Sequence, residues 1–174
     1  MHNDLMHAVA RGAAYYGMAR QGKGVRVRGG VPRTYYIGIE AAAPAVPGMR
    51  PPIKLLTLVP FGMEEGTGHQ LKERQFALGI GERARFRFFQ SANRHEDAAG
   101  LLLDEIPEGV DETAVVEAFL TGNPGETVPV TIESLVTETG MLELWFVAND
   151  ARRWKLEFNV RPKPDKRDAE RRRK

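Results

Sequence analysis

The side chains best suited to catalysis or metal binding are scattered along this chain. Its four histidines are His2, His7, His69 and His95. They show no metal-ligand spacing, because two are five residues apart near one end and the others stand alone. Ser91 and Ser134 are nucleophilic in type, but neither stands in the Gly-x-Ser-x-Gly pattern of a nucleophile elbow. The sequence therefore predicts neither a metal site nor a serine-based active site.

Paired carboxylates and one Gly-Lys-Gly segment are the other features with chemical potential. The acidic pairs, which could act as general acid and base, are Glu64-Glu65, Asp104-Glu105 and Asp111-Glu112. All three fall in predicted loops or strand ends, where solvated turns explain them. Gly22-Lys23-Gly24 lacks the glycine spacing and the Ser or Thr of a phosphate loop. We therefore expect no catalysis, and neither a cofactor nor a metal bound by this chain.

Composition and charge narrow the class of protein. The chain has 174 residues, 42% of them hydrophobic, which is enough for one ordinary folded domain. It has no cysteine, so disulfides and thiol chemistry are excluded and a reducing compartment is compatible. No apolar run approaches the roughly 18–20 residues that span a bilayer, and no signal-peptide pattern is present. We expect a cytoplasmic protein with no membrane partner.

The net charge of +2 is unevenly distributed. Residues 1–40 hold six basic and two acidic side chains, and residues 161–174 hold eight and three. Residues 41–160 hold eleven basic and eighteen acidic side chains, so the middle of the chain is acidic. A nucleic-acid surface on that part is therefore disfavoured.

The elements that must position any site are mainly β-strands. Short runs of β-type residues with turn residues between them predict an antiparallel β-sandwich over residues 34–160. The predicted strands are 34–39, 53–59, 75–80, 84–89, 100–103, 128–136, 141–148 and 153–160. The pattern at 112–120 fits either a strand or a helix. We expect loops at 41–52 and 64–69 and a hairpin turn at Gly81-Glu82-Arg83.

The two ends differ from this pattern. Residues 1–21 carry helix signals from about residue 3, and residues 22–33 form a basic, Gly-rich linker. Residues 161–174 are charged and contain two prolines, so we expect a disordered basic tail.

Four stretches carry a resemblance to a known family. They are Ala8-Val9-Ala10-Arg11-Gly12-Ala13-Ala14, Ile37-Gly38-Ile39-Glu40, Thr57-Leu58-Val59-Pro60 and Thr139-Gly140-Met141-Leu142, with Ile106-Pro107 and Val128-Pro129 in the expected order. Together they resemble the C-terminal part of the DnaK-type chaperones, the 70-kDa heat-shock protein family. The first stretch is similar to the last helix of that family's ATPase domain, and the others are similar to strands of its peptide-binding β-sandwich.

The resemblance implies a domain that holds extended, apolar segments of unfolded proteins. The implied peptide-binding residues are Ile39, Met49, Ile53, Phe76, Ala77, Gly79, Ala84 and Phe86. ATP and magnesium belong to the ATPase domain of full-length relatives, so ATP would regulate binding only there. A separate ATPase domain or a cochaperone is the further partner that the resemblance implies.

This chain departs from the family pattern in several places. The connector Val25-Arg26-Val27-Arg28 is basic where the family has an apolar, acidic linker, and Ala84 is smaller than the usual pocket residue. Residues 108–127 look like an insertion. Two other readings stay open: a non-catalytic β-sandwich interaction module whose basic tail contacts nucleic acid or an acidic partner, and a gene fragment without a function of its own.

Overall fold

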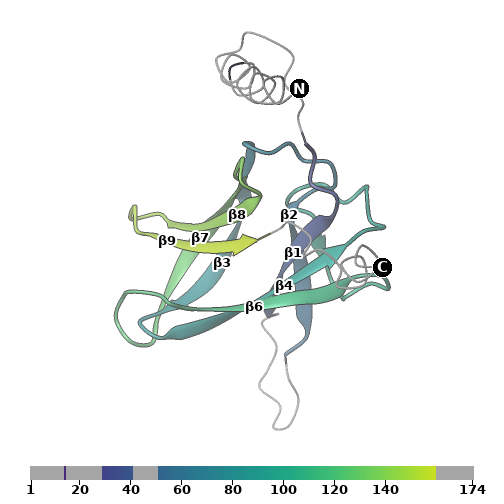
Figure 1. The fold of residues 1–174 in the computed structure, drawn as a ribbon. Coiled ribbons are helices and arrows are strands. Elements are labelled where there is room, and N and C mark those ends of the chain that lie inside the picture. Colours follow the sequence, from purple (N-terminus) through teal and green to yellow (C-terminus); the bar gives the residue numbers. More distant parts are fainter. Residues whose placement is uncertain (1–13, 15–28, 41–50, 160–174) are drawn as a thin grey trace, which may run out of the picture.

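Nine antiparallel strands make up the part of the chain that the computed structural model describes, which comprises residues 14, 29–40 and 51–159. The strands are β1 (Thr34–Glu40), β2 (Ile53–Val59), β3 (Gly68–Ile80), β4 (Arg83–Ser91), β5 (Leu102–Leu103), β6 (Asp111–Phe119), β7 (Glu126–Val136), β8 (Met141–Ala148) and β9 (Arg153–Asn159). They form two sheets, with the orders β5-β2-β1-β4-β6 and β3-β7-β8-β9 (Figure 1). The prediction of a mainly β, antiparallel fold is confirmed. The predicted helix (apart from Ala14), Met49 and the tail at 161–174 lie outside the described residues.

The main hydrophobic core lies between the two sheets. Strands β7 and β8 alternate buried with partly exposed residues, as strands with one covered face do. Phe86 and Phe88 of β4 point to the same core, whereas Arg85 and Arg87 point away from it. The buried hydroxyl of Ser134 on β7 also donates to the carbonyl of Leu58 on β2, 2.8 Å away, and so links the sheets.

A second layer covers the outer face of the five-stranded sheet. Tyr36, Leu55 and Phe89 form a small core there with Val110. Hydrogen bonds from the sheet hold the covering segment: Thr34 Oγ1 donates to the carbonyl of Arg94 at 2.5 Å, and Ser91 Oγ to that of Gly109 at 2.7 Å. Residues 92–110 are therefore part of the folded unit.

The polar centre of this layer is Asp97. The buried Tyr36 hydroxyl donates to Asp97 Oδ2 at 2.7 Å, and the Arg94 guanidinium donates to both carboxylate oxygens at 2.6 and 2.9 Å. Burial alone would raise the pKa of Asp97, but the hydrogen bonds from Arg94 and Tyr36 lower it below the ordinary value. The ionised carboxylate therefore stabilises the fold.

The tight turn at Gly81 joins the two sheets and is not a hairpin, so that prediction was wrong. Strand β3 pairs with β7, and β4 pairs with β1 and β6. The Gly81 N–H donates to the carbonyl of Leu120 at 2.7 Å, and the Leu120 N–H donates to that of Glu82 at 3.2 Å. The chain therefore turns a corner between sheets at this point, fixed by the segment after β6.

Other boundaries also differ from the prediction. The segment 112–120, which is ambiguous in sequence, lies almost entirely in β6 (Asp111–Phe119), because this strand pairs along the length of β4. Strand β3 begins at Gly68, inside a predicted loop, because Gly68 to Leu71 pair with Leu135 to Ile132. Val31, placed in the predicted linker, is buried and exchanges backbone hydrogen bonds with Gly62 and Met63.

The geometry of the corner predicts that Gly81 cannot be replaced by a residue with a side chain without loss of stability. Gly81 has φ +80°, and a Cβ would lie 2.3 Å from the carbonyl oxygen of Asn123. We expect Gly81→Ala to lower the free energy of unfolding by more than about 2 kcal/mol, because backbone strain and a backbone clash add. Gly125→Ala is the control, since Gly125 has φ +76° and an added Cβ meets nothing within 4 Å. Urea unfolding followed by tryptophan fluorescence measures both, and equal losses would contradict the clash.

The buried carboxylate predicts a pH dependence. Because the folded pKa of Asp97 is below the ordinary 3.8, its contribution is present at neutral pH and is lost as the pH falls through that region. Asp97→Asn should therefore lower the free energy of unfolding at neutral pH. The difference in this free energy between the variant and the native chain should become smaller in acid. Urea unfolding at several pH values tests this, and a difference that is constant with pH would contradict it.

Candidate functional site

Strands β1 and β4 separate at one end of the five-stranded sheet. Their pairing runs from Thr34 with Ser91 to Ile37 with Phe88 and ends there. Strand β1 stays paired with β2 as far as Glu40, and β4 stays paired with β6 back to Arg83. Backbone edges of both strands therefore border an opening beyond Ile37.

A cavity of about 200 Å³ lies at this opening. The wall of the cavity includes residues from the core-facing side and from the outer side of β1 and β4. The cavity therefore extends between the two strands to the core. The lining residues are Ile37, Gly38, Ile39, Glu40, Ile53, Phe76, Ala77, Leu78, Arg85, Phe86, Arg87, Val130, Ile132 and Phe146. The deepest of them, including Val130 and Ile132, are almost completely buried and apolar. The cavity thus combines an apolar interior with nearby backbone edges.

Five of the eight residues proposed from the sequence line this cavity: Ile39, Ile53, Phe76, Ala77 and Phe86. Ala84 packs on the edge of the main core outside the cavity. Gly79 is exposed, because it alternates with the buried Leu78 and Ile80 on β3. Met49 lies outside the described residues. The structure therefore brings residues from four separate strands to one place.

Sequence reasoning missed the interior of the cavity. Val130, Ile132 and Phe146 come from β7 and β8 of the opposite sheet. Strand β8 is apolar on both faces apart from Glu143, so its sequence does not show that Phe146 points inward. The inward orientation of Val130 and Ile132 could have been found, since apolar residues recur at every second position there in β7. The strand that each would face could not, because sheet-to-sheet contacts leave no local signal in the sequence.

Charged side chains surround the outer end of the cavity. Arg85 forms an ion pair with Glu117 at 3.2 Å, and Arg87 binds Glu112 of the same neighbouring strand. Glu40 adds one carboxylate at the end of β1. The rim of the cavity therefore carries mixed charge, whereas its interior is apolar.

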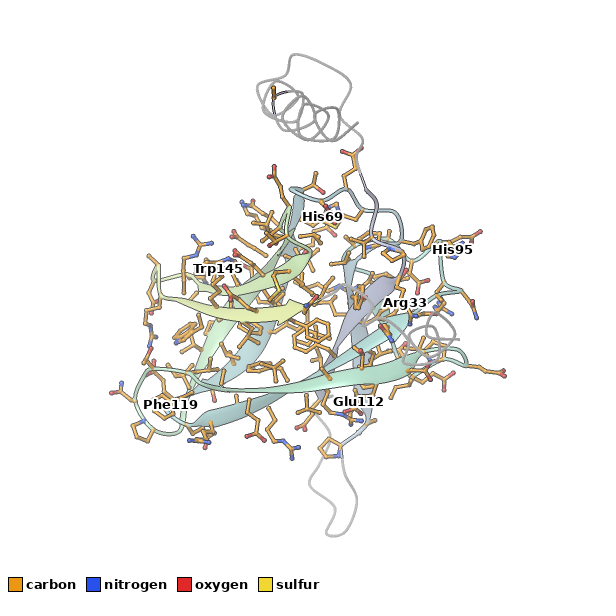
Figure 2. The ribbon with its side chains drawn as sticks, in the orientation of Figure 1. Arg33, His69, His95, Glu112, Phe119 and Trp145 are labelled. Atoms are coloured by element: carbon orange, nitrogen blue, oxygen red, sulfur yellow. The ribbon has the colours of Figure 1, made fainter. Side chains whose placement is uncertain are left out.

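Residues with catalytic potential lie elsewhere or are engaged in structural contacts. Ser91 and Ser134 donate their hydroxyl hydrogens to backbone carbonyls. His69 lies on β3 and His95 in the segment after β4, and both are labelled in Figure 2. Among the described residues no three His, Cys, Asp or Glu side chains are grouped to hold a metal ion.

A second hollow of about 200 Å³ lies beside an irregularity in β3, between Leu71 and Phe76. Its polar wall includes the exposed His69 and Glu73. The cavity between β1 and β4 has the more apolar lining and lies beside the separated strands, so we regard it as the better candidate.

Comparison with known proteins adds no relative. The chain matches no protein-family model, and no curated protein matches it. Within residues 14, 29–40 and 51–159, no helix is long and apolar enough to cross a membrane.

Substitutions of the cavity-lining residues should lower the stability by different amounts, most where the side chain is most deeply buried. Phe86 is 8% exposed and stacks on Phe146 with ring centroids 5.1 Å apart, so Phe86→Ala should cost about 3–5 kcal/mol of stability. Ile39 is only partly buried at the end of β1, so Ile39→Ala should cost about 1 kcal/mol. Urea unfolding of both variants measures this, and equal costs would contradict the assigned depths.

Proposed function

We propose that this chain binds extended apolar segments of unfolded proteins in the cavity between β1 and β4, without catalysis. The observation that carries the proposal is the separation of the two strands directly over an apolar interior. An added extended segment gains main-chain hydrogen bonds at the strand edges, and an apolar pocket takes one of its side chains.

The expected affinity follows from the size of the site. Burying one Leu-sized side chain contributes about 1.5–3 kcal/mol. Micromolar binding needs about 8 kcal/mol, so backbone hydrogen bonds and flanking contacts must supply the rest. A cavity of about 200 Å³ suits one such side chain, which favours short segments of limited sequence specificity.

The resemblance to the peptide-binding domain of DnaK-type chaperones supports the same function. Ile39 and Phe86 were proposed from that resemblance, and both line the cavity. On this proposal ATP and magnesium regulate binding only in full-length relatives, through an ATPase domain or with a cochaperone. A cytoplasmic location fits the absence of cysteine.

The direct test is fluorescence anisotropy of a labelled Leu-rich peptide titrated with the full chain. We expect saturable binding with a micromolar dissociation constant. Absence of binding up to millimolar protein or peptide would overturn the proposal.

A pair of variants assigns the binding to the cavity. Ile39→Asp places a charge in the apolar wall and should weaken binding at least tenfold. Phe61→Asp is the control, because Phe61 is 40% exposed and lies just beyond the end of β2 remote from Ile53. Equal weakening by both variants would place the peptide elsewhere, provided that urea unfolding shows both to be folded.

A further inference from the structure

Three aromatic rings from three different strands line the cavity between β1 and β4. Phe76 comes from β3, Phe86 from β4 and Phe146 from β8. The Phe86 and Phe146 rings are stacked with an interplanar angle of 28°. Since two sheets contribute these rings, a side chain entering the cavity meets π faces or edges from both layers.

We propose that this cavity selects segments whose inserted side chain is an aromatic ring, in preference to a branched aliphatic side chain. This inference rests on the peptide-binding function proposed above and names its preferred substrate class. An aromatic ring and a leucine bury comparable apolar surface, so burial alone separates them weakly. Offset or edge-to-face contacts between rings add a further attraction that leucine cannot make.

The size of the cavity is compatible with one ring. Its volume is about 200 Å³. An apolar protein cavity of about 150 Å³ is large enough to bind benzene. The volume is therefore sufficient for a single phenyl group beside Val130 and Ile132, which belong to the buried part of the wall.

Phe76 is the ring best placed to act on specificity without holding the fold together. It is only partly buried, whereas Phe86 is 8% and Phe146 3% exposed in the main core. It also follows the irregular part of β3, where pairing with β7 shifts between Leu71 and Phe76. Phe76→Leu keeps an apolar side chain of similar size and removes only the ring.

The test uses three labelled peptides that differ only in the central residue: phenylalanine, leucine or cyclohexylalanine. Cyclohexylalanine matches the size of phenylalanine but has no π system. With the full chain, we expect the phenylalanine peptide to bind about 2- to 10-fold more tightly than the leucine peptide, the range that one aromatic pair supplies. Cyclohexylalanine should bind more weakly than phenylalanine.

Each outcome decides a different point. Leucine binding as tightly as phenylalanine, or cyclohexylalanine as tightly as phenylalanine, would overturn aromatic selection while leaving peptide binding intact. Failure of all three peptides to bind would overturn the proposed function itself.

The variant Phe76→Leu tests whether the preference comes from the ring of Phe76, which lines this cavity and also borders the second hollow. We expect the ratio of the phenylalanine to leucine affinities to fall toward one in Phe76→Leu. The ratio should be unchanged in the control variant Phe61→Leu. The native Phe61 ring lies outside the cavity and stacks on His95, with ring centroids 3.9 Å apart. An unchanged ratio in Phe76→Leu would contradict the role of this ring.

Discussion

The described fold depends on one short connection, the two residues Gly81 and Glu82 between β3 and β4. Three Cα steps from Ile80 to Arg83 span at most about 11 Å, which is close to the spacing of about 10 Å between packed sheets. The start of β4 must therefore stay beside the four-stranded sheet, while its other end pairs with β1. This constraint explains why β4 leaves β1 beyond Phe88 and why an opening exists between the strands (Figure 1).

The remaining contacts keep that opening in place. Leu120 binds both residues of the corner through its backbone, so β6 follows β4 away from β1. On the outer face, the Tyr36–Asp97–Arg94 cluster and the Ser91 hydroxyl fix residues 92–110 over the paired half of the sheet. These polar side chains and the Ser134 hydroxyl thus hold the scaffold together, whereas the candidate site has an apolar interior beside the separated strand edges.

Local patterns predicted much of this, and long-range pairing explains what they missed. The alternation of Arg85 and Arg87 with Phe86 and Phe88 predicted which face of β4 is buried, and Thr139-Gly140 predicted the turn between β7 and β8. The Gly81 turn resembles a hairpin in sequence, because nothing local records that the flanking strands join different sheets. Ile39 and Phe86 were proposed as site residues from the family resemblance, as was Phe76 of the four-stranded sheet. Phe146 was not proposed, because β8 is apolar at nearly every position and its sequence does not show which face is buried.

Amide hydrogen exchange on the full chain, with and without a bound apolar peptide, tests the central claim most directly. If the peptide lies as an extended segment between the separated strands, some amides gain protection when it binds. They lie in Gly38 to Glu40 of β1, which pair with β2 but not with β4, and in Ala84 to Arg87 of β4. The ladders between β7 and β8, which are complete without peptide, change little. Protection confined to other segments, with these two stretches unchanged at saturating peptide, would contradict the account.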